Sequence, residues 1–462
     1  MDVAFGTDGW RATRQEITPN RLHAIAEAIS KYLHEVGKDE KPVAVGYDAR
    51  RHAESDAQEL ARVLAAEGHE VLFADRDCPT PSLAHGIVER GLAGGIMVTA
   101  SHNPPEYGGV KFIPEDGAPA LPAVTDTIES YIDKPEYTLD DPATIRKVDF
   151  LTPHIRAVQD RINADLNGLT VAYDGLYGSG RGVTDQVLEN AGAEVLQFRC
   201  DRDPEFGGEA PNPTADRLEQ IIDAVNSGEA DIGIANDGDA DRIAVVTSNG
   251  YVDANKLFGI YYTYLLQSES GPAVRTVSTT FLIDRIAQAH AEDVVETPVG
   301  FKWVAKAMDE NDALIGGEES GGFTIRDHVR NKDGVLAGLL ACAAAVEQPI
   351  EEWIDELLEQ HGEIHQDRIS IDCPDHLKAE TMGKISDNRP ESIAGESVTN
   401  VNTADGVKML LADGAWILVR PSGTEPKLRI YAEADTEIRV EELLETGQEF
   451  VVAQKTAVQE DS

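Results

Sequence analysis

The sequence predicts an α/β protein: three similar α/β units with mixed sheets, followed by a smaller α+β module. Strand-like and helix-like segments alternate through most of the chain, and this alternation restarts near residues 169 and 274. From residue 367 the pattern changes to half-buried strands and a closing helix. The length of 462 residues allows three or four domains of ordinary size. We therefore expect domains at 1–142, 143–248, 249–364 and 365–462.

The individual elements follow from periodicity and from helix-ending residues. In the first unit, 42–47 is a short apolar run that predicts a buried strand, and 53–67 has helical spacing that ends at Gly68, a suitable C-cap. Further strands are expected at 71–74 and 95–99, with a helix at 83–90. The second unit has a strand, a helix and a strand at 169–173, 183–190 and 194–198. The third begins with a strand and a helix at 274–278 and 283–290. The last module has strands at 367–373, 415–420 and 427–432 and a helix at 437–454.

The chain is strongly acidic, with 83 acidic against 40 basic residues and a net charge of −43. Such a surface repels nucleic acids and anionic membranes, so neither is expected as a partner. The charges are scattered among apolar segments, which excludes a disordered chain. The excess of Asp and Glu resembles proteins of salt-accumulating microorganisms and predicts a halophilic archaeon as the source. A merely acidic protein of a mesophile is the alternative.

The cysteine pattern and the first residues of the chain indicate the cellular compartment. Four cysteines lie far apart without a C-x-x-C pair, which argues against a zinc site or a disulfide framework. The first residues lack a basic start followed by an apolar run, and no apolar stretch approaches the roughly 20 residues of a membrane helix. We expect a cytoplasmic protein.

The segment 97–104 places Ser101 directly after a predicted strand, among small and turn-forming residues. A serine there is exposed to chemistry but needs activation, which His102 could supply. The G-x-S-x-G signature of a hydrolase elbow is absent. The alternative is a capped turn in which Ser101 only binds backbone groups.

The segment 234–242 carries three carboxylates, Asp237, Asp239 and Asp241, separated by small residues. Carboxylates at this spacing can converge on one hard cation such as Mg²⁺. A calcium-binding EF-hand is excluded, because its sixth and twelfth positions are here Arg242 and Ser248. Arg242 suits a phosphate that bridges metal and cation. A solvated acidic turn is the alternative.

Two further segments suit a phosphorylated sugar. Glu318 and Ser320 lie between glycines and can bind sugar hydroxyls, and the basic segment 327–334 with Lys332 follows them. Segment 419–429 combines cations, hydroxyls and a glycine into a phosphate cradle made of Arg420, Ser422, Gly423, Thr424 and Arg429. Plain surface turns are the alternatives. The glycines of 178–182 do not complete a dinucleotide fingerprint, because its third glycine would fall at Val183.

Together with the opening 5–11, Phe-Gly-Thr-Asp-Gly-Trp-Arg, these four segments resemble the α-D-phosphohexomutase family over nearly the whole chain. The resemblance implies four domains around a central cleft, the last of a TATA-binding-protein-like type. It implies that Ser101 is carried as phosphoserine and that Mg²⁺ binds the three aspartates together with a phosphate oxygen of Ser101. It also implies that Glu318 and Ser320 hold the sugar and that the Arg420 segment holds the distal phosphate.

The activity implied is interconversion of hexose 1-phosphate and hexose 6-phosphate through a phosphoserine enzyme, with glucose 1,6-bisphosphate as intermediate and primer. Lys111 is the first candidate for the general base, with His102 and Arg11 as positioning or charge-stabilising groups. Segments 317–321 and 327–334 look most like phosphoglucomutases, so glucose phosphate is expected first. Phosphomannomutase and phosphoglucosamine mutase are alternatives within the family. A Mg²⁺-dependent sugar phosphatase and an inactive sugar-phosphate binder are alternatives outside it. The protein is expected as a monomer or a homo-oligomer.

Overall fold

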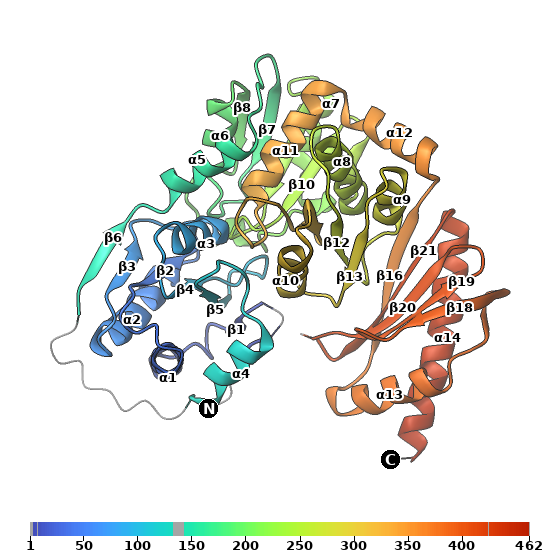
Figure 1. Ribbon diagram of the computed structural model, residues 1–462, viewed down its shortest axis with the longest axis horizontal. Helices are drawn as coiled ribbons and strands as arrows, with labels where there is room; N and C mark the ends of the chain where they lie inside the picture. Colours follow the sequence, from blue (N-terminus) through green and yellow to red (C-terminus); the bar gives the residue numbers. More distant parts are fainter. Residues whose placement is uncertain (1–2, 7, 133–142, 424, 462) are drawn as a thin grey trace.

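The computed structural model describes residues 3–6, 8–132, 143–423 and 425–461. Four sheets, each at the centre of one unit, follow one another in an arc in Figure 1, from blue strands through green and yellow to red. The first three sheets are mixed and the fourth is antiparallel. The predicted fold class is therefore confirmed: three α/β/α units and a C-terminal antiparallel half-barrel.

The first sheet has the order β1-β5-β4-β2-β3-β6. Its strands are β1 (Trp10–Thr13), β2 (Val43–Tyr47), β3 (Val71–Ala74), β4 (Gly94–Val98), β5 (Tyr107–Pro114) and β6 (Ile145–Val148), and its helices are α1 (Pro19–Glu35), α2 (Ala53–Ala66), α3 (Thr80–Glu89) and α4 (Pro122–Ser130). Strand β6 pairs in parallel with β3, so the first sheet extends past the boundary expected at 142/143.

The second sheet has the order β11-β10-β9-β7-β8. Its strands are β7 (Thr170–Asp174), β8 (Glu194–Phe198), β9 (Ile232–Asn236), β10 (Ile243–Thr247) and β11 (Gly250–Val252), with helices α5 (Leu151–Arg161), α6 (Thr184–Asn190) and α7 (Glu219–Asn226). Alternate residues of β9 and β10 are buried on opposite faces. One face packs against Ile221 and Val225 of α7, and the other joins the main core.

The third sheet has the order β13-β12-β14-β15, with strands β12 (Ala273–Thr276), β13 (Val294–Thr297), β14 (Ile315–Gly317) and β15 (Phe323–Ile325). Its helices are α8 (Ala254–Leu266), α9 (Leu282–Ala289), α10 (Phe301–Asn311), α11 (Gly334–Glu347) and α12 (Ile350–His361). Helix α11 contacts β9, β10 and α6 as well as α8, so it is shared by the second and third units. This shared burial explains why α11 is apolar on nearly all sides.

In the described part of the chain, no single helix has the length and apolar composition to cross a membrane. Only α11 and α12, which are bent by 83° relative to each other, meet those criteria as a pair.

The fourth sheet has the order β16-β21-β20-β19-β18-β17. Its strands are β16 (His365–Asp372), β17 (Ser392–Ile393), β18 (Glu396–Asn402), β19 (Val407–Leu411), β20 (Trp416–Pro421) and β21 (Lys427–Ala434), with helices α13 (Asp375–Asp387) and α14 (Glu437–Asp461). The two helices cover one face around Ile417 and Ile430. The other face places Trp416 and Leu418 against Val277 of the third unit, which connects the half-barrel to the rest of the protein.

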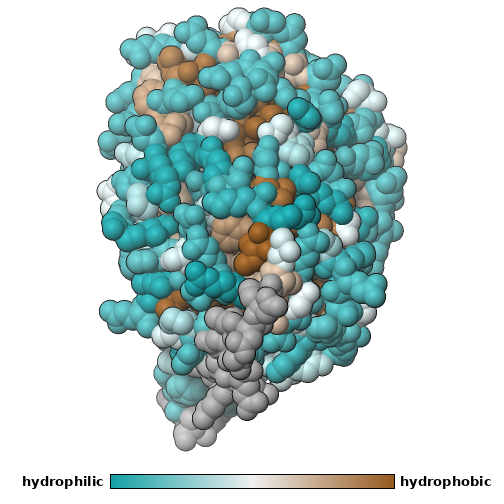
Figure 2. Space-filling model, turned by 90° about the vertical axis from the view of Figure 1, so that its left-hand side faces the viewer, coloured by the Kyte–Doolittle hydropathy of each residue, from teal (hydrophilic) through white to brown (hydrophobic). Residues whose placement is uncertain are grey.

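Hydrophilic side chains cover most of the face shown in Figure 2, and the apolar patches on it are small and separate. The acidic residues that dominate the composition are thus compatible with an ordinary buried core. The largest core cluster runs through the first three units, and a separate cluster lies inside the fourth.

Two helix glycines give a matched test of this packing. Gly86 in α3 faces Phe150, and a Cβ at this position would overlap the Phe150 ring, whereas Gly383 in α13 has no atom within 4 Å of an added Cβ. We expect Gly86→Ala to destabilise the protein by about 1–3 kcal/mol through overpacking. Gly383→Ala should stabilise it by up to about 1 kcal/mol, because alanine favours the helix. Thermal unfolding followed by circular dichroism measures both, and an unchanged or raised Tm for Gly86→Ala would contradict the packing described.

Candidate active site

Three of the chemistry-bearing loops occupy equivalent places in the three α/β units. Each leaves the carboxyl end of a parallel strand and leads into an antiparallel one, at β4–β5, β9–β10 and β14–β15. Ser101 lies in the first loop, the three aspartates in the second and Glu318 in the third. Loops at the carboxyl ends of strands are where α/β folds place their binding groups.

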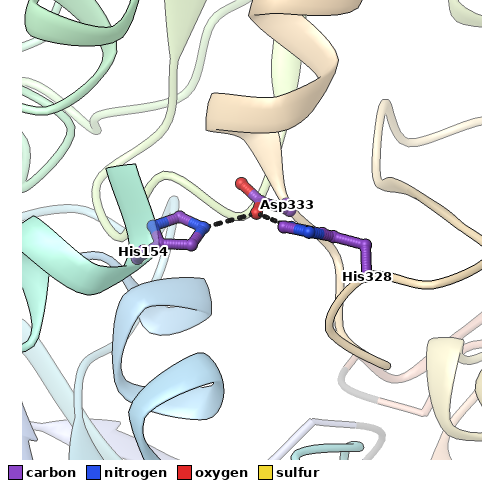
Figure 3. Close-up of side chains that lie close together, drawn as sticks. All are labelled: His154, His328 and Asp333. Atoms are coloured by element: carbon purple, nitrogen blue, oxygen red, sulfur yellow. Dashed lines mark hydrogen bonds and ion pairs between the residues drawn. The ribbon is translucent and has the colours of Figure 1, made fainter. Parts of the chain in front are cut away.

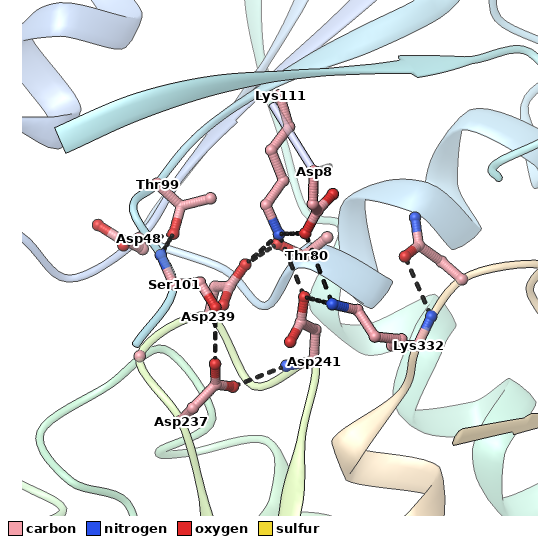
Figure 4. Close-up of polar contacts among 12 residues, drawn as sticks. Asp8, Asp48, Thr80, Thr99, Ser101, Lys111, Asp237, Asp239, Asp241 and Lys332 are labelled. Atoms are coloured by element: carbon pink, nitrogen blue, oxygen red, sulfur yellow. Dashed lines mark hydrogen bonds and ion pairs between the residues drawn. The ribbon is translucent and has the colours of Figure 1, made fainter. Parts of the chain in front are cut away.

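Ser101 contacts the aspartate loop directly. Its Oγ donates a hydrogen bond to Asp237 Oδ2 at 2.8 Å, and both residues are fully buried (Figure 4). The Ser101 N–H donates to Thr99 Oγ1 at 2.8 Å, and φ of Ser101 is +51°, a left-handed value that is uncommon for serine. His102 Nδ1 is 3.4 Å from the same Oγ. The backbone therefore holds the serine in a strained conformation that presents its Oγ to a carboxylate.

A buried arginine that the sequence analysis did not select holds this loop. Asp48 accepts the Arg50 Nε–H at 3.0 Å and the Thr99 hydroxyl at 2.7 Å. The Arg50 guanidinium donates at 2.6–3.1 Å to four backbone carbonyls of the loop, those of Ser101, Asn103, Pro104 and Tyr107. The only sequence signal was an Asp-x-Arg after a predicted strand, which has no specificity by itself.

The aspartate loop is fixed from within and from the first unit. Asp237 Oδ1 accepts the backbone N–H groups of Asp241 and Arg242 at 3.1 and 3.2 Å. Thr80 at the start of α3 donates its hydroxyl to Asp239 Oδ2 at 2.6 Å. Ala240 has φ of +52°, a left-handed conformation that glycine adopts more easily than alanine.

Two lysines compensate the carboxylates (Figure 4). Lys111 Nζ is 2.9 Å from Asp239 Oδ2, 3.1 Å from Asp241 Oδ2 and 2.8 Å from Asp8 Oδ2. Lys332 Nζ is 3.0 Å from Asp241 Oδ2 and 3.5 Å from Asp8 Oδ2. Lys111 comes from β5 of the first unit and Lys332 from the loop before α11 in the third unit, and the structure places both ammonium groups against Asp241. It also adds Asp8, which lies in the opening motif but was not selected as a site residue.

Burial and charge shift the proton affinities of these groups strongly. Burial, with Asp241 and Asp239 nearby, raises the pKa of Asp237 to about 8. Burial opposes the charge of Lys111, but Asp239 and the other two carboxylates raise its pKa well above the ordinary value. The Arg242 cation, burial and the Arg11 cation lower the pKa of His102 to about 2, so this imidazole is neutral.

The carboxylate cluster fits a divalent metal ion. Asp237, Asp239 and Asp241 each offer one oxygen, and these oxygens all lie within 4.8 Å of one another. Asp239 Oδ1 and Asp241 Oδ1 are buried and have no hydrogen-bond partner, which is costly unless a cation or a ligand binds them. Oxygen-only ligands suit a hard cation. The cluster is therefore a candidate metal site.

Two arginines surround this cluster. Arg242 Nε lies 3.8 Å from Asp241 Oδ1 and is buried without a hydrogen bond. Arg11 donates to Asn103 Oδ1 in the serine loop at 3.0 Å. Arg242 thus lies beside the aspartates and Arg11 beside the serine loop, so both could compensate the charge of a phosphorylated Ser101.

The predicted sugar loop lies beside the same cluster. Glu318 is buried, accepts the Gly300 N–H at 3.0 Å, and burial raises its pKa to about 7. Ser320 is exposed to solvent. Gly322 leaves room for Lys332, whose side chain a Cβ at this position would overlap. The loop therefore controls the position of a lysine that reaches the aspartates.

The fourth loop joins β20 to β21. Arg420 forms an ion pair with Asp405 at 3.0 Å, and Arg429 pairs with Glu425 at 2.8 Å. The Lys378 ammonium donates to the Ser422 carbonyl at 2.8 Å, so a lysine of α13 holds the loop from behind. Gly423 lies at its exposed tip, and Thr424 falls outside the described residues. Both arginines thus have carboxylate partners within the fourth unit.

A second polar cluster is formed by His154, His328 and Asp333 (Figure 3), the last of which follows Lys332 in the sequence. Asp333 Oδ2 accepts hydrogen bonds from His154 Nε2 at 2.6 Å and His328 Nε2 at 2.7 Å, while Asp333 Oδ1 caps the start of α11. Two ligand atoms of one zinc ion lie about 3.3 Å apart, so these shorter distances are those of hydrogen bonds. Since Ser82 of α3 also bonds His154 at 2.8 Å, the cluster connects three units and fixes the residue next to Lys332.

The metal assignment predicts cation binding that depends on Asp239. Because replacing a carboxylate by an amide removes one charge from the ligand set, Asp239→Asn should weaken Mg²⁺ binding by at least about tenfold. Asp216→Asn makes the same change at an exposed position of the same unit and should have no effect. Calorimetric titration with Mg²⁺ alone measures both. Equal affinity in Asp239→Asn and in the unchanged chain would contradict the assignment.

Comparison with known proteins agrees with this arrangement along the whole chain. Models of the Phosphoglucomutase/phosphomannomutase family match its alpha/beta/alpha domains I, II and III over residues 2–138, 148–250 and 253–361, and its C-terminal domain over 372–446. A crystal structure from Thermus thermophilus, described provisionally as a phosphomannomutase, superposes with a TM-score of 0.85 at 30% identity and covers 98% of this chain and 99% of that one.

Curated relatives carry different substrate names. A "probable phosphoglucosamine mutase" of Methanopyrus kandleri is 33% identical over 100% of this chain and 99% of its own length. A "phosphoglucomutase/phosphomannomutase" and a "phosphopentomutase" of Thermococcus kodakarensis are 30% and 33% identical, over 97% and 96% of this chain and 98% and 96% of their own lengths. These comparisons do not support a halophilic source. They do show that the chain belongs to the phosphoglucomutase/phosphomannomutase family of α-D-phosphohexomutases and is an intramolecular phosphotransferase of that family.

Proposed function

We propose that the protein interconverts hexose 1-phosphates and hexose 6-phosphates through a phosphoserine at Ser101. The observation that carries this proposal is the 2.8 Å contact between Ser101 Oγ and Asp237, inside a buried group of carboxylates and cations. Phosphoryl transfer needs positioning and charge compensation more than covalent chemistry, and this arrangement supplies both.

The reaction follows from phosphoserine chemistry. The Oγ–P bond of phosphoserine 101 breaks as the free hydroxyl of the bound hexose monophosphate takes the phosphoryl group, which gives a hexose 1,6-bisphosphate. The proton of that hydroxyl ends on the freed Ser101 Oγ. The bisphosphate turns over, and its other phosphoryl group returns to Ser101. Mg²⁺, which family members bind, would be held by Asp237, Asp239 and Asp241 and would neutralise charge on the transferring group.

The remaining residues take roles that their environments support. Lys111 and Lys332 compensate negative charge beside Ser101, and the raised pKa of Lys111 favours charge stabilisation over the proton-accepting role expected from the sequence. Arg11, Arg242 and His102 orient the phosphoryl group on Ser101. Glu318 and Ser320 bind sugar hydroxyls, and Arg420, Ser422, Gly423, Thr424 and Arg429 bind the distal phosphate.

Glucose phosphate is the substrate we propose first. Segments 317–321 and 327–334 look most like those of phosphoglucomutases, and a side chain at Gly322 would displace Lys332 from its present position. These local features support glucose phosphate, although several relatives are named phosphoglucosamine mutases. Mannose and glucosamine phosphates are the alternatives. A cytoplasmic location, salt adaptation and a monomeric or homo-oligomeric state stay predictions.

Ser101→Ala tests the proposed function. Without the Oγ that accepts the phosphoryl group, the enzyme should lose labelling by ³²P-labelled glucose 1,6-bisphosphate and at least about 10³-fold of its turnover. Turnover is measured in a coupled assay with Mg²⁺ and KCl, using glucose, mannose, glucosamine and ribose 1-phosphates, each primed with its own bisphosphate.

Ser55→Ala, at an exposed serine of α2 in the same unit, is the control and should label and turn over normally. Full activity of Ser101→Ala would refute the phosphoserine role. Release of inorganic phosphate instead of the isomeric sugar phosphate would show that the protein is a phosphatase.

A further inference from the structure

Arg420, the cation proposed to bind the distal phosphate, is held by a carboxylate that no sequence motif indicated. Asp405 Oδ2 accepts from Arg420 Nε at 3.2 Å and from Arg420 Nη2 at 3.0 Å. The exposed fraction is 20% for the Asp405 side chain and 13% for the Arg420 side chain, so the pair is partly shielded from water. Partial shielding makes such a pair stronger than an open surface salt bridge.

The backbone around Asp405 is fitted closely to Arg420. Asp405 lies in the turn 403–406 between β18 and β19, next to Gly406 with φ of +89°. A Cβ at Gly406 would lie 2.7 Å from Arg420 Cβ, so only glycine allows the turn to approach the arginine this closely. The position of the carboxylate is therefore set by the fold and not by a flexible surface contact.

The same carboxylate oxygen also reaches the third unit. Asp405 Oδ2 accepts the Val299 N–H at 3.0 Å, and the next backbone N–H, that of Gly300, donates to Glu318 Oε1 at 3.0 Å. Two adjacent peptide groups of the turn before α10 are thus bound by two carboxylates. One carboxylate is that of Glu318, in the proposed sugar loop. The other is that of Asp405, which pairs with Arg420, the arginine proposed to bind the phosphate.

We propose that Asp405 is a positioning residue that sets the distance between the sugar contact at Glu318 and the phosphate contact at Arg420. The proposal rests on the proposed function of these two loops. A substrate with a sugar ring and a phosphate must satisfy both contacts at once. Because the two contacts are connected, binding energy can select a substrate in which the sugar hydroxyls and the phosphate are separated by one particular distance.

The guanidinium geometry lets Asp405 remain bound while Arg420 receives the phosphate. A guanidinium offers two hydrogen-bonding edges, and Asp405 takes the edge made by Nε and Nη2. The other edge, made by Nη1 and Nη2, can donate to two phosphate oxygens. Asp405 therefore orients the arginine for a bidentate contact, as an outer carboxylate orients a metal-binding histidine.

The test is a double-mutant cycle between Asp405 and Arg420. Asp405→Asn keeps an oxygen that can accept the Val299 N–H but removes the charge that orients Arg420. It should raise KM for glucose 1-phosphate by about five- to twentyfold and change kcat by less than about twofold. In an Arg420→Ala background the same change should alter KM by less than about twofold, because the partner it acts through is gone.

Asp413→Asn is the matched control, since Asp413 is an acidic residue of the next turn of the same unit and pairs with Arg439 at 2.9 Å. It should leave KM and kcat unchanged. A lowered KM in Asp405→Asn would show that Asp405 competes with the phosphate, and independent effects of the two substitutions would show a merely structural role. Either result overturns the proposal.

Calorimetric titration with inorganic phosphate separates this proposal from the proposed function. It needs no turnover, and it should show the same weakening in Asp405→Asn and the same loss of coupling in Arg420→Ala. If no hexose phosphate is isomerised but this coupling is present, the proposed function fails and the role of Asp405 stands. If isomerisation occurs without the coupling, only the role of Asp405 fails.

Discussion

The site depends on the contact between two buried loops from different units. The Ser101 Oγ meets Asp237, and behind this hydrogen bond the backbone at Gly238 lies against the Ser101 carbonyl, where an added Cβ would be 2.6 Å from the oxygen. Arg50 holds one loop through its carbonyls, and Thr80 holds the other through Asp239. The shared helix α11 and the cluster at Asp333 keep the units that carry these loops together.

Charge compensation is the second constraint. A chain with −43 net charge has few cations to place in its interior, yet Lys111 and Lys332 both contact Asp241 and Asp8 (Figure 4). Burying such groups is costly, and well-packed apolar residues would stabilise the fold at least as well. The cluster is therefore best explained by chemistry: burial, together with the neighbouring Asp241 and Asp239, raises the pKa of Asp237 to about 8, and such a crowded carboxylate site favours a bound cation.

Periodicity and turn residues predicted the fold class and the loops that carry Ser101, the aspartates and Glu318, because these signals are local. Pairing between distant segments was not predictable in this way. Strand β6 joins the first sheet through β3, beyond the expected boundary. Asp8, Arg50 and Asp405 reach Lys111, the Ser101 carbonyl and the Val299 N–H, which are all far away from them in the sequence. Ala240 has φ of +52°, a left-handed backbone conformation that favours glycine. Such a conformation is expected in a functional loop, where the surrounding structure overrides the preference of the residue.

The most direct test of the account is to separate the two loops without removing any reacting group. Gly238→Ala adds one methyl group that meets the Ser101 carbonyl. Single-turnover transfer from ³²P-labelled glucose 1,6-bisphosphate to Ser101 is then compared with that of Gly383→Ala, the exposed helix variant. We expect transfer in Gly238→Ala to slow by about 10²-fold, since a displacement of this size misaligns the reacting atoms. Transfer at the rate of the unchanged chain, in a Gly238→Ala protein with an unchanged Tm, would contradict it.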